Sequence, residues 1–195
     1  MSLLSSTYLI RPNFRPIRSS YIQKVMNMRT HSSWQRSAKE QAPQTAATLY
    51  DYAISLLARR DYSVAELYDR LGRRTDNLAL IDQVVNELQQ QGLQSDERFT
   101  EVFIRSRISR RHGPRRILND LKLKGVDTSL AQDIMHTTEV DWYALACEAL
   151  AARFTSPGVD LRERAKRQRF MAGRGFDSDQ MRHALAHAWD MEEDS

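Results

Sequence analysis

The sequence contains little cysteine and little glycine. Of its 195 residues, one is cysteine (Cys147) and seven are glycine. A single thiol excludes an intrachain disulfide framework and a zinc site built from several thiolates, so we expect a reducing compartment. The glycines form no GxxxxGK[ST] motif and no GxGxxG motif that follows a strand. We therefore expect no loop that cradles a nucleotide phosphate.

Long hydrophobic runs are absent as well. No segment approaches the ~18 consecutive apolar residues that a membrane-spanning helix needs. The opening MSLLSSTYLI lacks the basic region and the cleavage pattern of a secretory signal. These absences predict a soluble, cytoplasmic protein that makes no membrane contact. With 41% apolar and 28% charged residues, the protein can still build a core of ordinary size in one or two domains.

Positive charge is concentrated near the start of the chain. The net charge is +4 and the pI is 9.4. The first 45 residues hold seven basic side chains and one acidic side chain, whereas the other 150 residues hold 22 basic and 24 acidic ones. The high pI is therefore no indication that the folded part binds nucleic acid.

Residues 1–44 show no apolar periodicity and combine proline, basic and small polar residues. This composition predicts a disordered extension. Because the segment is rich in arginine and serine and poor in acid, it also fits an organelle transit peptide. A third interpretation is that translation begins at Met26 or Met28, which would make the leading residues a start-site artefact.

From residue 46 onward the apolar residues follow a helical period. Leu49, Tyr52, Ala53 and Leu56, for example, fall on one stripe of a helix. Ser63 is a good N-cap, and Glu66, three residues later, would complete a capping box. Asp96, similarly, is expected to cap the helix that follows it. No segment has the alternating pattern of a strand, so the sequence predicts an all-α protein.

The helices fall into three units of similar length, which we place at residues 46–94, 96–138 and 141–191. Two turns at corresponding places read KGVD (Lys124–Asp127) and RGFD (Arg174–Asp177), which indicates an internal repeat. Within the second unit, Gly113 is expected to end one helix and Pro114 to begin the next. The sequence thus predicts three tandem three-helix repeats, helix-turn-helix-like units that form an elongated array in which each unit mainly contacts its neighbours.

Catalytic chemistry is poorly represented. His183 and His187 have the i, i+4 spacing of a helix-borne metal site, but surface histidines beside an apolar stripe are the better interpretation. Gly173–Phe176 is best explained as the end of a helix, and Cys147 as a small buried apolar residue. We predict no catalytic residue, no cofactor and no metal, and hence a protein that is not an enzyme.

Arginine and lysine cluster in the second and third units. Some can pair with acids at i, i+4: Arg105 with Glu101, Arg116 and Lys124 with Asp120, Arg167 with Glu163, Arg70 with Glu66 and Arg73 with Asp69. Eight others lack such a partner and are our candidates for a surface that binds phosphate or an acidic protein patch: Arg107, Arg110, Arg111, Arg115, Lys122, Arg162, Lys166 and Arg169. The alternative is a solvated helix face with no partner.

Three strings resemble the bacterial RecX family of recombination regulators: LLARRDYSVAEL (56–67), GLQSDERFTEVFIRSRISRRHGPRRILNDLKLKGVD (92–127) and RFMAGRGFD (169–177), with an Asp-Trp pair at 141–142. The resemblance extends over about residues 48–190. It implies an all-helical fold of three tandem three-helix repeats. It also implies a non-enzymatic regulator that binds the RecA recombinase and its filament on single-stranded DNA and mostly inhibits its ATPase and strand exchange. Roles in DNA repair, DNA recombination and the SOS response follow from that relation.

Two parts of the sequence depart from the family pattern. Residues 1–44 have no counterpart, and Thr75–Asp76–Asn77 stands where the other units have a turn glycine. We expect a monomer that lies along the filament groove, with possible non-specific DNA contact. A rival hypothesis is direct binding to DNA by a helix-turn-helix unit, and a third is a general protein scaffold.

Overall fold

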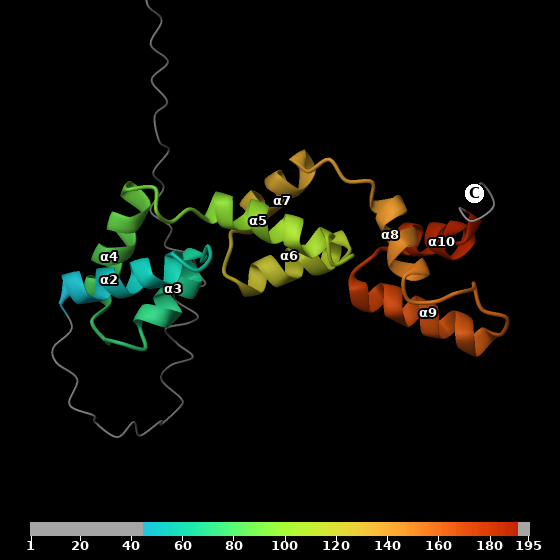
Figure 1. Ribbon diagram of the computed structural model, residues 1–195, viewed down its shortest axis with the longest axis horizontal. Helices are drawn as coiled ribbons and strands as arrows, with labels where there is room; N and C mark the ends of the chain where they lie inside the picture. The colour runs from blue at the N-terminus through green and yellow to red at the C-terminus, as the bar shows by residue number, and fades with distance from the viewer. Residues whose placement is uncertain (1–44, 191–195) are drawn as a thin grey trace, which may run out of the picture. The chain divides into compact units, whose positions relative to one another are not determined.

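The structure is a computed structural model that describes residues 45–190, in which all regular secondary structure is α-helical (Figure 1). The predicted all-α class and the three tandem three-helix repeats are confirmed over this range. The predicted extension at residues 1–44 lies outside the described residues. None of the described helices is both long and apolar enough to cross a membrane.

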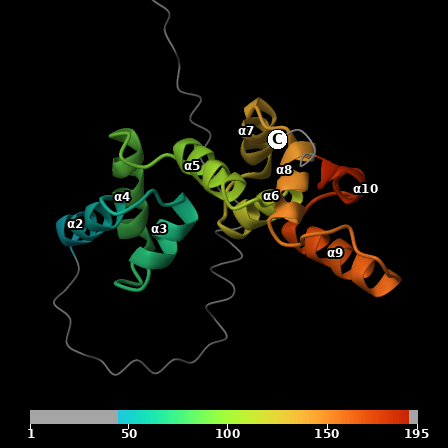
Figure 2. The ribbon, with the colours of Figure 1, turned by 45° about the vertical axis from the view of Figure 1, so that its right-hand side comes forward.

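The described helices follow one another along the chain in three groups of three. Repeat 1 consists of α2 (Ala46–Leu57), α3 (Val64–Leu71) and α4 (Leu78–Gln90). Repeat 2 consists of α5 (Asp96–Ile108), α6 (Pro114–Leu123) and α7 (Thr128–Thr137). Repeat 3 consists of α8 (Trp142–Ala151), α9 (Leu161–Arg174) and α10 (Ser178–His187). Figure 2 shows α2, α3 and α4 together, apart from the helices of repeat 3. The exact division at 46–94, 96–138 and 141–191 stays a prediction.

Capping side chains explain where most of these helices begin. The side chain of the preceding residue accepts a hydrogen bond from the first turn in eight of the nine helices described between residues 45 and 190. Ser63 caps α3 as predicted, through a 3.1 Å hydrogen bond from the Glu66 amide. The predicted cap at Asp96 is wrong, because Ser95 caps α5 and Asp96 is its first residue. Only α6, among the helices in this range, begins without a capping side chain, at Gly113, with Pro114 in its first turn as predicted.

Left-handed residues close four of the helices. Gly92, Gly125 and Gly175 have φ of 69°, 75° and 88°, where a glycine meets no steric penalty. The helix α5 ends differently from the prediction. Its left-handed residue is Arg111, at φ 56°, whereas Gly113 has φ −77° and begins α6. The reason for a glycine at position 113 is therefore not its backbone angle.

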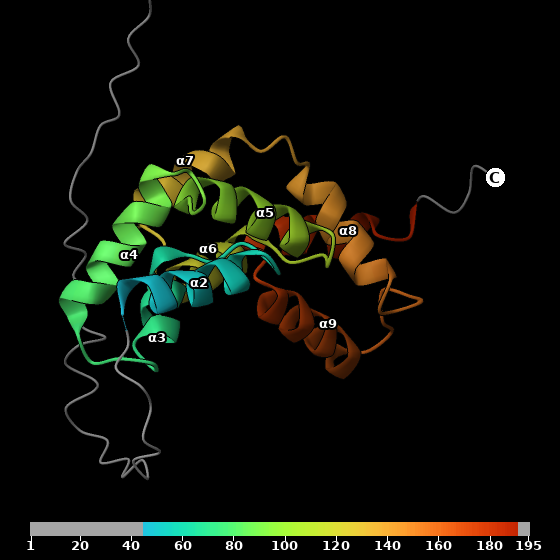
Figure 3. The same cartoon turned by 60° about the vertical axis from the view of Figure 1, so that its left-hand side comes forward.

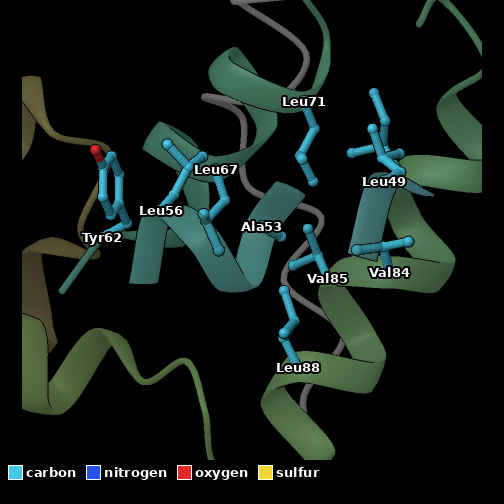
Figure 4. Close-up of a cluster of buried hydrophobic side chains, with 10 residues drawn as sticks. Leu49, Ala53, Leu56, Tyr62, Leu67, Leu71, Val84, Val85 and Leu88 are labelled. Atoms are coloured by element: carbon cyan, nitrogen blue, oxygen red, sulfur yellow. The ribbon is translucent and has the colours of Figure 1, made fainter. Parts of the chain in front are cut away.

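Each repeat has its own apolar core. In repeat 1 the core includes Leu49, Leu67, Leu71 and Leu88, which are fully buried between α2, α3 and α4 (Figure 4). The cores of repeats 2 and 3 are not fully separate, because Ile108 and Trp142 pack against both. Ile108 lies at the end of α5 and Trp142 at the start of α8, so apolar packing joins these two repeats.

Candidate interaction surface and the junctions between repeats

The KGVD turn of repeat 2 docks against the start of the second helix of repeat 1. The Ser63 hydroxyl, which caps α3, donates a 2.7 Å hydrogen bond to the backbone carbonyl of Lys124. The Nζ atom of Lys124 lies 2.6 Å from Oε1 of Glu66, in the first turn of the same helix. The Glu66 carboxylate also accepts a 2.9 Å hydrogen bond from Arg60. Glu66 therefore forms an ion pair across the junction and does not form the predicted reciprocal contact with Ser63.

Polar side chains fill the rest of this junction. Asp96 Oδ1 accepts hydrogen bonds from the Val64 amide at 2.8 Å and from the Gln94 side chain at 2.9 Å. The Gln94 side chain, only 3% exposed, also donates to the carbonyl of Tyr62 at 3.2 Å. Burial raises the pKa of Asp96 above its ordinary value, although these hydrogen bonds oppose the shift. Repeats 1 and 2 are thus joined mainly by hydrogen bonds and charge.

The RGFD turn of repeat 3 docks in the same way on the start of the second helix of repeat 2. The Gly113 amide donates to the Arg174 carbonyl at 2.8 Å, and the Arg115 amide donates to the Gly175 carbonyl at 3.2 Å. Arg116 donates to the carbonyl of Gly173 at 2.7 Å. Backbone carbonyls of repeat 3 therefore serve as the cap that α6 lacks in its own sequence. Figure 1 shows the start of α6 near the end of α9.

Two of the eight candidate residues already have partners within the described residues. The Nε atom of Arg107 lies 3.2 Å from Oδ2 of Asp120, and the guanidinium stacks over the Phe103 ring at 4.6 Å. Arg111 is 3.6 Å from the Glu148 carboxylate of repeat 3. The inference that these two arginines are unpaired was wrong, because their partners lie on other helices and cannot be found by i, i+4 spacing.

The other six candidates have exposed side chains that make no hydrogen bond or ion pair with any residue in the 45–190 range. They are Arg110, Arg115 and Lys122 in repeat 2, and Arg162, Lys166 and Arg169 in repeat 3. We call these six residues the basic surface. The structure brings Arg110 and Arg115 to the two ends of the short turn between α5 and α6. The three residues of repeat 3 all lie on α9.

The predicted local ion pairs are partly correct. Four form as expected, with separations of 2.7 to 4.0 Å: Arg73 with Asp69, Arg105 with Glu101, Arg116 with Asp120 and Arg167 with Glu163. Lys124 binds Glu66 in place of the predicted pairs of Lys124 with Asp120 and of Arg70 with Glu66. Arg167 is 6% exposed and lies under the Phe154 ring, so it has a structural role.

A shallow groove of about 500 Å³ runs between α9 and α10. Met181, Leu185 and Ala172 contribute apolar surface to it, and Arg169 and Arg182 contribute charge. Arg182 is held 3.2 Å from Asp179. The groove is open to solvent, and its lining residues include no pair of groups suited to acid–base chemistry.

The residues weighed for catalytic or metal chemistry all have structural neighbours. Burial raises the pKa of the Cys147 thiol, which disfavours the reactive thiolate. The His187 ring lies 2.8 Å from the Asp190 carboxylate, and the His183 ring packs between His187 and Tyr143. Both histidines of α10 therefore belong to one group of ring and carboxylate contacts.

Comparison with known proteins identifies the family. Residues 95–135 match the model described as RecX, second three-helix domain, and residues 139–185 match RecX, third three-helix domain. The regulatory protein RecX of Chromohalobacter salexigens is 53% identical over 144 residues, covering 74% of this chain and 95% of that protein. The regulatory protein RecX of Halorhodospira halophila is 37% identical over 150 residues, covering 76% and 92%.

Two solved structures share the fold. A crystal structure of regulatory protein RecX aligns with a TM-score of 0.63 at 19% identity, over 72% of this chain and 71% of that one. RecX from Lactobacillus salivarius aligns with a TM-score of 0.61 at 22% identity, over 74% and 96%. At these identities the two structures support the fold alone. The assignment to a family rests on the sequence relatives. The chain belongs to the RecX family of regulatory proteins.

Proposed function

We propose that this protein binds the RecA recombinase filament on single-stranded DNA and mostly inhibits its ATPase, growth and strand exchange. It would thereby regulate DNA repair and recombination in the cytoplasm, acting as a monomer and without catalysis of its own. Family membership supports the proposal, since the relatives are named regulatory protein RecX. The observation that carries it is the basic surface, whose six side chains have no counterion within residues 45–190.

The basic surface suits a nucleoprotein partner better than bare DNA. Outside the first 45 residues the protein has 22 basic and 24 acidic side chains, so its net charge does not attract it to a polyanion in general. The unpaired positive charge is instead concentrated on α6, α9 and the turn before α6. Such positions can meet exposed phosphates and acidic protein patches of one assembly, and arginine can bind either one in a bidentate manner.

The direct test is the DNA-dependent ATPase of RecA with this protein added at substoichiometric amounts. We expect the rate to fall. Arg110→Glu with Arg115→Glu should weaken both inhibition and filament binding. The two glutamates would repel the phosphate or carboxylate groups that the arginines are proposed to bind. Arg111 is left out of this variant, since its loss would also break the contact with Glu148.

A matched control reverses two charges in repeat 1 whose side chains form no ion pair within residues 45–190, Arg59→Glu with Arg70→Glu. This control changes the net charge by the same amount as the test variant. If the basic surface has a specific role, the control variant should inhibit RecA almost as well as the wild type. An unchanged ATPase rate with the wild-type protein, together with no detectable filament binding, would refute the proposed function. Equal losses in both double variants would show that net charge alone matters.

Direct DNA binding by a helix-turn-helix unit remains the alternative. In such units the first residues of the second helix contact base edges. Here the start of α6 is covered by the turn of repeat 3, through the contact between Gly113 and Arg174. Base readout by α6 would therefore need the two repeats to separate. Tight and strongly salt-dependent binding to naked duplex, in the absence of RecA, would favour this alternative.

A further inference from the structure

In repeats 1 and 2 the start of the second helix is covered by the following repeat. The side chains of Tyr62 and Val64, on each side of the α3 cap, pack in the core of repeat 1, and their backbone carbonyl and amide bind Gln94 and Asp96 at the junction. His112 and Pro114, at the corresponding positions before and after Gly113, are both half-buried. The residues on each side of the helix cap therefore form part of a junction in both repeats.

The same place in repeat 3 is uncovered and apolar. Val159 and Leu161, on each side of the α9 cap, are 92% and 84% exposed. The helix α9 has 14 residues against 10 in α6, so it is about one turn longer. In Figures 1, 2 and 3 its first turn projects away from α8 and α10. We call Val159 and Leu161 the apolar tip.

Two backbone amides beside the apolar tip bind neighbouring carboxylates. Oδ1 of Asp160 accepts a 2.7 Å hydrogen bond from the Glu163 amide, and Oε2 of Glu163 accepts a 3.0 Å hydrogen bond from the Val159 amide. An anion would meet two carboxylates here. The aliphatic side chains of Val159 and Leu161 lie exposed beside these two carboxylates.

Positive charge follows directly behind the tip. Arg162, Lys166 and Arg169 recur at i, i+4 and i+7, which places them along one face of α9. Terminal repeats of helical arrays ordinarily present a polar outer face, because exposed apolar ends aggregate. Two large aliphatic side chains at the end of a projecting helix, with a basic stripe beside them, are typical of a surface that a partner covers.

We propose that the apolar tip is a docking site for a protein partner that offers an apolar pocket bordered by carboxylates. This inference rests on the proposed function and deepens it: the end of repeat 3 contacts a recombinase subunit, and phosphate contacts fall to Arg110, Arg115 and Lys122. Valine and leucine offer neither a donor to phosphate nor an aromatic face on which a base can stack. Their burial in a pocket, by contrast, is favourable by the hydrophobic effect.

A second copy of this protein is a poorer fit for the tip. The docking turns at the two internal junctions both contain a left-handed glycine, at positions 125 and 175. The corresponding turn of repeat 1 carries Thr75–Asp76–Asn77 and no such glycine. Head-to-tail assembly through that turn would need a backbone shape that its residues rarely adopt.

The test is the affinity of the full-length protein for RecA filaments on single-stranded DNA. Val159→Ser with Leu161→Gln should weaken binding by about tenfold or more, because two apolar contacts are lost. The same fold-loss is expected at low and high salt. Arg162→Glu with Lys166→Glu should lose affinity mainly at low salt, because the charge contribution is screened. The conservative pair Val159→Ile with Leu161→Met should retain binding.

Leu78→Gln with Val102→Ser is the matched control, since both residues are large, apolar and exposed but lie outside the tip. Its affinity should stay near that of the wild type, and all variants should keep the wild-type melting temperature. Wild-type affinity in the tip variant would overturn the inference while leaving the proposed function intact. Absence of binding by the wild type would overturn both. Concentration-dependent self-association that the tip variant abolishes would assign the tip to a second copy and also overturn the inference.

Discussion

The backbone amide of Gly113 donates a 2.8 Å hydrogen bond to the carbonyl of Arg174. The corresponding contact one repeat earlier joins the Ser63 hydroxyl to the carbonyl of Lys124 at 2.7 Å, also across 61 residues of sequence. In both cases the residue that precedes the turn glycine accepts a hydrogen bond from the cap of the preceding repeat's second helix. Equivalent hydrogen bonds therefore join repeat 1 to repeat 2 and repeat 2 to repeat 3.

Gly113→Ala should destabilise the junction between repeats 2 and 3. An added Cβ would lie 2.5 Å from the carbonyl carbon and oxygen of Gly175, and backbone atoms cannot rotate away as a flexible side chain can. We expect a loss of about 1–3 kcal/mol in the free energy of unfolding, measured by urea denaturation. Gly173→Ala is the control, because a Cβ there meets nothing within 4 Å and alanine favours the helix. Equal stability of Gly113→Ala and wild type would contradict the close approach.

Arg111→Gly should stabilise the protein by about 1 kcal/mol, because Arg111 occupies the left-handed region at φ 56°. The exposed contact with Glu148 that this change removes is worth less. Arg110→Gly, one residue earlier, relieves no such strain and should cost stability through backbone entropy. Thermal melting of the two variants is expected to shift in opposite directions.

Coupling between Glu66 and Lys124 should exceed that of an exposed ion pair. The Glu66 side chain is 15% exposed and that of Lys124 is 39% exposed. A double-mutant cycle with Glu66→Gln and Lys124→Met should give a coupling of about 1 kcal/mol, a modest value because Lys124 stays partly solvated. Arg73 with Asp69 serves for comparison, since both side chains are more than half exposed. Similar coupling in both cycles would mean that burial at the junction adds nothing.

Acidification should lower the free energy of unfolding, in part because His112 becomes protonated. Burial, followed by the positive charges of Arg116 and Arg174, holds the pKa of His112 below its ordinary value of 6.5. The unfolded state therefore binds a proton more readily. The stability contributed by neutral His112 is fully present above pH 6.5 and is lost as the pH falls through the lower folded-state pKa.

His112→Gln removes this contribution. We expect urea denaturation at about pH 7.5 and about pH 5.5 to show a smaller loss of stability on acidification than in the wild type. A loss as large in His112→Gln as in the wild type would assign the acid sensitivity to other groups.

Much of the fold could be predicted because helices depend on neighbours within four residues. The apolar stripe of Leu49, Ala53 and Leu56 and the cap at Ser63 are local patterns, and the structure reproduces them. The candidate surface was harder to predict. Arg107 and Arg111 looked unpaired because Asp120 and Glu148 lie on other helices. Asp96 looked like a cap, yet its carboxylate binds the Val64 amide of another repeat.

The sequence by itself determined the all-helical class, the threefold repetition and the likeness between the KGVD and RGFD turns, since each follows from side chains at fixed spacings. Only the tertiary structure decided what those turns do. The acceptors are backbone carbonyls, which every residue has, so no pattern of side chains marks the contact of Gly113 with Arg174. Which arginines stay free for a partner was decided in the same way, because packing brings acids from distant segments beside some of them and leaves others exposed.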